Sequence, residues 1–323
     1  IGIDVLLYIR NNDILSNIDG LNNISSIGID GRLNISNNAM LVDVDGLSSL
    51  NSIGEGANLD IYDNAILSNI NNLNSLSSLD GFLSIYDNPM LVNVNGLSNL
   101  NSIGIDGFLS IRGNPILSNV DGLSSLNSID GNLSISNNAM LVNIDGLSSL
   151  NSIGIDGWLT IRDNPLLSNI DNLSSLTSLE GNLWIRYNPL LSNIDGLSNI
   201  SSIGIDGWLN IRGNDLLSNV DGLSNLTSIG SDGKLSIRDN AILNNIDGLN
   251  SLNSIGTNGE LQISDNEALS LCCGVFALLD SGVLGDIVIE NNLPNCNSEA
   301  EILQNCSANN LLSIKIYLEG AYN

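Results

Sequence analysis

One asparagine recurs along almost the whole chain at intervals of 24 or 26 residues, and this period constrains the fold more than any other feature. In each copy the asparagine closes the motif Leu-x-Ile-x-x-Asn, as in residues 159–164. A period between about 20 and 50 residues is typical of solenoids, propellers and repeat arrays, in which each repeat packs mainly against its neighbours. We therefore expect a single elongated body. Its twelve repeats are marked by Asn12, Asn38, Asn64, Asn88, Asn114, Asn138, Asn164, Asn188, Asn214, Asn240, Asn266 and Asn292.

Each repeat contains two segments that read as strands, joined by tight turns. The first is Leu-x-Ile, in which the alternation directs Leu and Ile inward. The second is Gly-Leu-Ser-Ser-Leu-Asn-Ser-Ile, as in residues 146–153. Asp-Gly pairs mark the corners, and the two-residue differences in repeat length fall at one corner, where they leave the core register intact. The pattern predicts an all-β, right-handed parallel β-solenoid of about twelve coils. At about 4.8 Å for each coil, the rod would be roughly 50 Å long.

The recurring asparagine would stack on itself in such a solenoid. Its amide group can bond the backbone of the coils on either side, which would form an asparagine ladder from Asn38 to Asn266. This role is structural and not catalytic. Because an unpaired buried polar group is costly, we expect Asn164→Ala to lower stability by about 1 to 3 kcal/mol.

Composition excludes several classes of function. The chain has nine basic and 35 acidic residues, and the formal charge of −26 argues against binding to nucleic acid or to anionic membranes. No apolar run reaches the roughly 18 residues of a membrane span, so no membrane insertion is expected. The chain has no His, no phosphate-binding glycine loop and no carboxylate that differs from its repeated copies, so we do not expect an enzyme.

All four cysteines fall near the end of the chain, where the repeat loses its regularity. Cys272 and Cys273 are adjacent, and Cys296 and Cys306 follow. Disulfides suit this arrangement better than a metal site, because the chain lacks both His and a C-x-x-C pair; the three possible pairings remain open. Disulfides imply an oxidising compartment, and hence a secreted or cell-surface protein.

The chain divides into a repeat solenoid over residues 1–266, a disulfide-stapled cap over residues 267–306 that includes the last coil, and residues 307–323. Residues 270–281 predict a short capping helix, which would cover the exposed end of the solenoid. Residues 311–318 alternate like a strand and would form a linker or the start of a further module. The first coil has no such cap, so we expect an upstream segment or another subunit to cover residues 1–12.

The repeat resembles a known family. The pattern Leu-x-x-Leu…Leu-x-Ile-x-x-Asn-x-x-Leu, as in residues 76–91, is similar to the leucine-rich repeat, and more closely to the receptor L-domain version of growth-factor receptor ectodomains and fungal and bacterial surface proteins. The resemblance covers about residues 5–292. It departs from the ordinary repeat in having Asn-x-x-Leu and in lacking a helical segment in each coil, which implies a straighter rod than a horseshoe. The ending, from Leu271 to Gly282 with Gly285 to Asn292 and Cys296, is similar to the cap of receptor-L-like arrays on secreted Bacteroidetes proteins, which implies export to the cell surface.

Variation within the repeat concentrates on one outward stripe. The positions before Leu, between Leu and Ile, and after Ile are expected to face solvent on one sheet. All three Trp and eight of the nine basic residues fall there. We call this surface the aromatic stripe, and its candidate ligand-binding residues are Phe82, Tyr86, Phe108, Arg112, Trp158, Arg162, Trp184, Arg186, Trp208, Arg212 and Arg238.

Three interpretations of the aromatic stripe remain open. Aromatic rings beside Arg suit stacking on sugars with charge-assisted bonds to acid groups, and they suit a protein partner equally well. Alternatively, aromatics simply favour strands and Arg offsets neighbouring Asp. The first two predict a recognition or adhesion module for a glycan or a protein; the third predicts a spacer or filament module.

Two further surfaces suggest weaker hypotheses. The regular Ser and Asn array, as in residues 148–152, could bind ice, although such surfaces favour Thr. A column of Asp at one corner would place carboxylates about 5 Å apart, where Ca²⁺ could relieve their repulsion. The alternative is that Asp favours the turn, and no other cofactor is expected. The column comprises Asp19, Asp45, Asp121, Asp145, Asp171, Asp195, Asp221 and Asp247.

Overall fold

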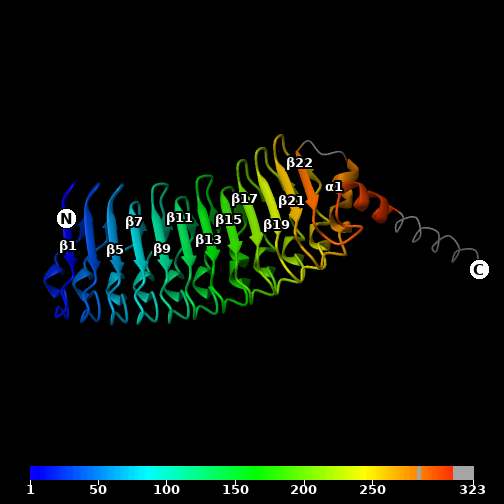
Figure 1. Ribbon diagram of the computed structural model, residues 1–323. Helices are drawn as coiled ribbons and strands as arrows, with labels where there is room; N and C mark the ends of the chain where they lie inside the picture. Colours follow the sequence, from blue (N-terminus) through cyan, green and yellow to red (C-terminus); the bar gives the residue numbers. More distant parts are fainter. Residues whose placement is uncertain (282–284, 308–323) are drawn as a thin grey trace, which may run out of the picture.

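The computed structural model describes residues 1–281 and 285–307 and shows a rod of stacked coils (Figure 1). One side of the rod is a parallel sheet of twelve strands in chain order, which confirms the predicted all-β parallel solenoid. The strands pair in register, so that Leu159 lies between Leu133 and Leu183. They are β1 (Leu6–Arg10), β3 (Arg32–Ser36), β5 (Asn58–Tyr62), β7 (Phe82–Tyr86), β9 (Phe108–Arg112), β11 (Asn132–Ser136), β13 (Trp158–Arg162), β15 (Asn182–Arg186), β17 (Trp208–Arg212), β19 (Lys234–Arg238), β21 (Glu260–Ser264) and β22 (Asp286–Glu290).

The other side of the coils carries short 3-10 helices, so the expectation that the coils lack a helical segment was wrong. The Asp-Gly-Leu segment forms a 3-10 helix, because i to i+3 bonds close around it, as in Leu147 N–H to Ile144 O at 2.8 Å. The 3-10 helices are η1 (Asp19–Leu21), η2 (Asp45–Leu47), η3 (Asn71–Leu73), η4 (Asn95–Leu97), η5 (Asp121–Leu123), η6 (Asp145–Leu147), η7 (Asp171–Ser175), η8 (Asp195–Leu197), η9 (Asp221–Leu223), η10 (Asp247–Leu249) and η11 (Cys273–Val275).

Only the last two residues of the second segment pair as strands. Eight of these short strands form one parallel sheet and two form another. The Ser and Asn array therefore lies over 3-10 helices and two-residue strands, and it lacks the flat sheet that the ice-binding hypothesis assumed. The short strands are β2 (Ser26–Ile27), β4 (Ser52–Ile53), β6 (Ser78–Leu79), β8 (Ser102–Ile103), β10 (Ser128–Ile129), β12 (Ser152–Ile153), β14 (Ser178–Leu179), β16 (Ser202–Ile203), β18 (Ser228–Ile229) and β20 (Ser254–Ile255).

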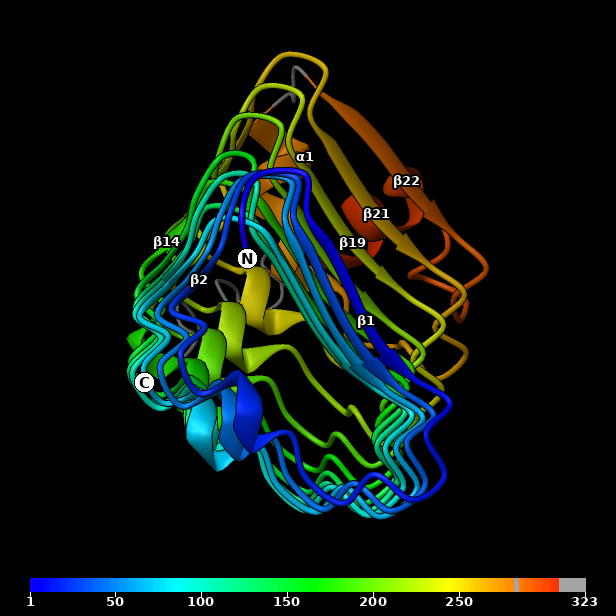
Figure 2. The ribbon, with the colours of Figure 1, turned by 90° about the vertical axis from the view of Figure 1, so that its left-hand side faces the viewer.

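The core runs through the centre of the rod as columns of Leu, Ile and Val side chains at equivalent positions of the coils. In the coil of β13, Leu159, Ile161, Leu167, Ile170 and Leu173 are all fully buried. Figure 2 looks along the rod and shows the coils superimposed around this interior. The rod bends only gently (Figure 1), because each coil opposes the strand with a compact 3-10 turn in place of a wide helix.

The recurring asparagines line one corner, where each side chain bonds two backbone groups of the preceding coil and each backbone N–H donates to the asparagine of the next coil, as Asn164 N–H does to Asn188 Oδ1 at 3.2 Å. The Asn164 Oδ1 atom accepts the backbone N–H of Asn138 at 3.1 Å. The Asn164 Nδ2 atom donates to the carbonyl of Ile135 at 3.1 Å. The same two bonds recur from coil to coil, and the side chains from Asn38 to Asn266 are fully buried. The ladder thereby satisfies backbone groups that the turn would otherwise leave unpaired.

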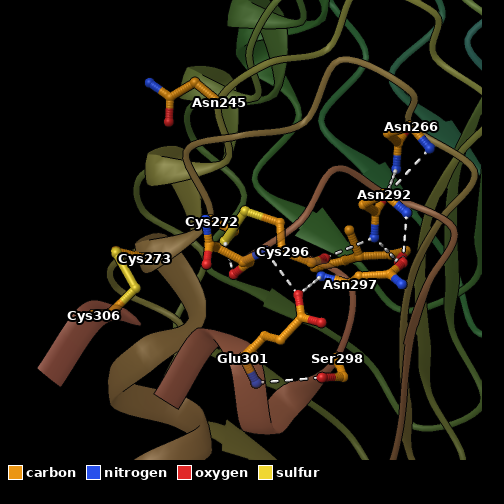
Figure 3. The surroundings of a disulfide bond; sticks show 12 residues. Asn245, Asn266, Cys272, Cys273, Asn292, Cys296, Asn297, Ser298, Glu301 and Cys306 are labelled. Carbon is orange, nitrogen blue, oxygen red and sulfur yellow. Dashed lines mark hydrogen bonds between the residues drawn. A yellow bond between two sulfur atoms is a disulfide. The ribbon is translucent and has the colours of Figure 1, made fainter. Parts of the chain in front are cut away.

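Two disulfides fasten the end of the solenoid (Figure 3). Cys272 pairs with Cys296, and Cys273 pairs with Cys306, so no cysteine is left to bind a metal. The helix α1 (Phe276–Ser281) lies within the segment expected to cap the rod, and residues 299–307 form a further helix. The strand-like residues 311–318 lie outside the described residues. No helix in the described part of the chain has the length and apolarity of a membrane span.

Candidate ligand-binding groove

The aromatic stripe contains a groove of about 580 Å³ on the outer face of the main sheet. Six of the predicted ligand-binding residues line it, and they come from β7, β9, β13 and β15. Tyr86, Arg112, Trp208, Arg212 and Arg238 lie beside the groove on the same face and do not line it. The lining residues are Phe82, Phe108, Asn132, Leu133, Ser134, Trp158, Thr160, Arg162, Trp184, Arg186 and Tyr187.

The groove exists because one strand carries only small outward side chains. On β11 the outward residues are Asn132, Ser134 and Ser136, and the first two form the floor of the groove. Parallel pairing places Asn132 between Phe108 on β9 and Trp158 on β13. These two large rings therefore stand two strand steps apart, or about 9.6 Å. Because the coil of β11 has small outward side chains and the coils on either side have large ones, a slot lies over β11 on the outer face of the sheet.

The aromatic rings of the stripe contact one another along the rod. Trp184 lies between the other two Trp rings, with centroids 4.5 Å from Trp158 and 5.1 Å from Trp208. The Arg186 guanidinium lies 3.7 Å from the centroid of the Trp184 ring and covers it. Trp158 remains 38% exposed, whereas Trp184 and Trp208 are half-buried. Trp158 is therefore the tryptophan best placed to stack on a ligand.

Several outward positions of the sheet are buried, so the expectation that all three face solvent was wrong for these coils. Long Arg, Tyr and Trp side chains lie across smaller neighbours, as where Arg32 bonds Asp60 at 3.0 Å. The buried outward residues are Asn34, Ser36, Asp60, Ser110, Ser136, Asn210, Ser236 and Ser264.

Some of this covered layer carries unpaired hydrogen-bond donors. Among the described residues, the indole N–H groups of Trp184 and Trp208, the Asn210 Nδ2 atom and the Arg238 Nε atom have no hydrogen-bond partner. All belong to β15, β17 and β19. The layer beneath the surface beside the groove therefore holds several N–H donors without acceptors.

The arginines of the stripe differ in their ion pairing. Arg162 contacts Asp163 at 2.6 Å, and Arg212 contacts Asp239 at 2.7 Å. Within the described residues Arg186 has no carboxylate partner, and its Nε atom donates to Asn210 Oδ1 at 3.1 Å.

The pKa of Arg186 is lowered from its ordinary value. Burial of the guanidinium is the main cause, and the positive charges of Arg238, Arg212 and Arg162 add to it. Four guanidinium groups thus lie within one small region of an otherwise acidic protein, and guanidinium groups form strong charge-assisted hydrogen bonds with anionic oxygens.

Tyr86 and Arg112 form a separate cluster next to the groove. Tyr62 and Tyr86 stack face to face with centroids 4.5 Å apart, and the Arg112 guanidinium lies 4.7 Å from the Tyr86 centroid. Burial, and next the neighbouring Tyr62, raise the pKa of Tyr86 to about 12. These side chains extend the aromatic surface toward the N-terminal end of the rod.

Sequence reasoning missed Tyr187, which lines the groove and is 42% exposed. It lies just after β15, at a position where the other repeats have Asn, Asp or Gly. That departure from the repeat was the signal available in the sequence.

The calcium hypothesis for the Asp column gains no support from side-chain clustering, because among the described residues no group of three or more His, Cys, Asp or Glu side chains could hold a metal ion. The turn explains why Asp recurs at this corner. The side chain of the residue two positions earlier accepts the backbone N–H of the Asp, as Asn119 Oδ1 accepts the N–H of Asp121 at 3.2 Å.

Comparison with known proteins assigns the chain to no family. No family model matches the chain, and no curated protein matches it. Among solved structures, the chain is similar to an internalin from Listeria monocytogenes, with 14% sequence identity, 83% of each chain covered and a TM-score of 0.34. A likeness this weak carries no argument about function.

Proposed function

We propose that this protein is a recognition or adhesion module of a cell surface, which binds a linear glycan along the aromatic stripe. The observation that carries the proposal is the slot over β11, where Phe108 and Trp158 stand on either side of a floor of small polar side chains. Sugar rings have apolar faces that stack on aromatic rings and hydroxyl groups that bond amides and hydroxyls. Asn132, Ser134 and Thr160 supply those polar groups.

The shape of the groove favours a chain over a compact ligand. Its lining residues come from five successive strands of the main sheet, from β7 to β15. Four strand steps correspond to about 19 Å along the rod. An extended polymer lying along the rod would contact all five strands, whereas a small molecule would contact two or three.

The disulfides support a place outside the cytoplasm, because such bonds persist in oxidising compartments. The groove has aromatic, amide, hydroxyl and guanidinium groups but no carboxylate among its lining residues, which suits binding and not general acid-base catalysis. We therefore propose binding without a chemical step.

Calorimetric titration with acidic and neutral polysaccharides tests the proposal. We expect saturable binding by the wild-type protein, and a loss of affinity of about tenfold or more for Trp158→Ala, since an exposed stacking ring contributes on the order of 1.4 kcal/mol. The matched control is Tyr8→Ala, which removes an exposed aromatic from β1, far along the same sheet. Its affinity should equal that of the wild type.

Absence of binding to every polysaccharide would overturn the glycan proposal. A protein partner would then become the better account, because Trp, Tyr and Arg are also the usual hot-spot residues of protein interfaces. A passive spacer would instead show no partner at all, and substitutions on the stripe would change nothing but stability.

A further inference from the structure

The chain turns through a left-handed residue after every strand of the main sheet. We call these residues the left-handed column. Asn, Asp and Gly tolerate a positive φ, whereas a bulky side chain does so rarely. The column contains one bulky residue, Tyr187, with φ of 53°. Its members are Asn11, Asn37, Asp63, Asp87, Gly113, Asn137, Asp163, Tyr187, Gly213, Asp239, Asp265 and Asn291.

The next coil leaves room for the Tyr187 ring. Gly213 occupies the following place in the column, and a Cβ atom there would lie 2.5 Å from Tyr187 Cδ1. The ring therefore lies directly on the backbone of that coil, yet it stays 42% exposed at the border of the groove. A strained residue that gains little burial is a feature of functional sites, where the strain serves to place a side chain.

The presence of Tyr187 also changes the local charge. Two aspartates of the column pair with arginines of the stripe, Asp163 with Arg162 and Asp239 with Arg212. A tyrosine in this place leaves Arg186 with no such partner among the described residues. Four arginines on β13, β15, β17 and β19 face two paired carboxylates, and 4 − 2 leaves two positive charges in a chain whose formal charge is −26.

A neutral hydrogen-bond donor, the Asn210 amide, also lies beside Arg186. Asn210 is fully buried, its Oδ1 atom accepts from Arg186, and its Nδ2 atom has no partner in the described structure. The Arg212 guanidinium lies 5.4 Å from the Tyr187 ring centroid, so the ring and both guanidiniums border the same place. This end of the groove combines a planar ring with unpaired positive charge.

We propose that Tyr187 and Arg186 form a subsite for the acid group of a sugar residue, a carboxylate or a sulfate. This inference rests on the proposed glycan-binding function and names its ligand as an acidic glycan. The Tyr187 ring stacks on the sugar, and Arg186 binds the acid group with the support of Arg212. Tyr187 occupies a position of the column at which Asp163 and Asp239 each pair with an arginine, and it offers no carboxylate to the guanidinium groups around it.

The test compares the wild type with Tyr187→Asn and Arg186→Gln. Asn is a usual residue of the left-handed column, so Tyr187→Asn removes the ring and the strain together. Affinities are measured by calorimetry for polygalacturonate, dextran sulfate and neutral dextran. We expect the wild type to bind at least one acidic polymer about tenfold or more tightly than dextran, and each variant to lose about tenfold toward that polymer.

Stability provides the readout that separates binding from folding. We expect Tyr187→Asn to raise the melting temperature while it weakens binding, because the left-handed strain is relieved. The control is Asp265→Asn, a change in the same column outside the groove, which should leave affinity unaltered.

The outcomes distinguish this inference from the proposed function. Wild-type protein that binds none of the three polymers overturns both. Wild-type protein that binds, and is weakened by Trp158→Ala, yet keeps its affinity within twofold in Tyr187→Asn and Arg186→Gln, overturns the subsite alone. Equal affinity of the wild type for dextran and both acidic polymers also overturns the subsite alone.

Discussion

The asparagine ladder allows a quantitative prediction for Asn164→Ala. Asn164 is fully buried, and its side chain accepts the backbone N–H of Asn138 and donates to the carbonyl of Ile135. Truncation leaves the Asn138 N–H buried and unpaired, whereas the Ile135 carbonyl keeps its place in the ladder of bonds between β11 and β13. At about 1 to 3 kcal/mol for one orphaned group, the free energy of unfolding should fall by about 1 to 3 kcal/mol. This agrees with the figure expected from the sequence.

Equilibrium unfolding in urea, followed by both circular dichroism and Trp fluorescence, measures this change. The two transitions must coincide for the free energy to be defined, since repeat arrays can unfold in parts. Asn12→Ala is the matched control: Asn12 is exposed at the end of the ladder, so water can replace its partners and the cost should stay within about 0.5 kcal/mol. A cost below about 1 kcal/mol for Asn164→Ala, or equal costs for both variants, would refute the ladder as a source of stability.

Two further predictions concern the turns between coils. In Gly146→Ala the new Cβ would collide with the backbone carbonyl of Val120 in the preceding coil, so we expect the free energy of unfolding, measured in urea, to fall by about 1 to 3 kcal/mol or more. The control is Gly20→Ala, which should be nearly neutral because a Cβ there would meet nothing within 4 Å. Equal losses in the two variants would contradict this explanation. The pKa of the Asp45 carboxyl is raised above its ordinary 3.8, first by burial and then by the charge of Asp43. The folded protein therefore binds a proton on Asp45 more tightly than the unfolded chain does, and the ionised carboxylate lowers the stability of the fold. Asp45→Asn should therefore raise the melting temperature at pH 7 and lose this advantage below about pH 3.8; an advantage that persists at lower pH would show another cause.

Much of the fold was predictable because each repeat has the same pattern of apolar, turn and asparagine positions. The Leu-x-Ile alternation placed Leu159 and Ile161 in the core, and the recurring Asn predicted the corner at Asn164. The 3-10 helices were missed because Gly-Leu-Ser-Ser-Leu has the same apolar spacing in a short helix as in an irregular strand. The choice between helix and strand is decided by i to i+3 hydrogen bonds, as at Leu147. These bonds depend on the close approach of Gly146 to the preceding coil.

The binding groove was predictable only in part. The residues of the aromatic stripe could be chosen because they depart from a uniform background, and six of them line the groove. The relative exposure of these residues could not be predicted, because it depends on which long side chain covers which neighbouring side chain. Arg186 covers Trp184, whereas Trp158 stays open, and this follows from rotamers and packing that no periodicity encodes.

By itself, the sequence determined the parallel solenoid, the number of its coils, the columns of its core and the position of its cap, since all of these follow from the period and from where it ends. Only the tertiary structure decided which cysteines pair, how the small residues of β11 open a slot between Phe108 and Trp158, and where Tyr187 lies. The physical reason is that repeats encode contacts between equivalent positions, whereas the pairing and the groove arise from contacts between positions that are not equivalent.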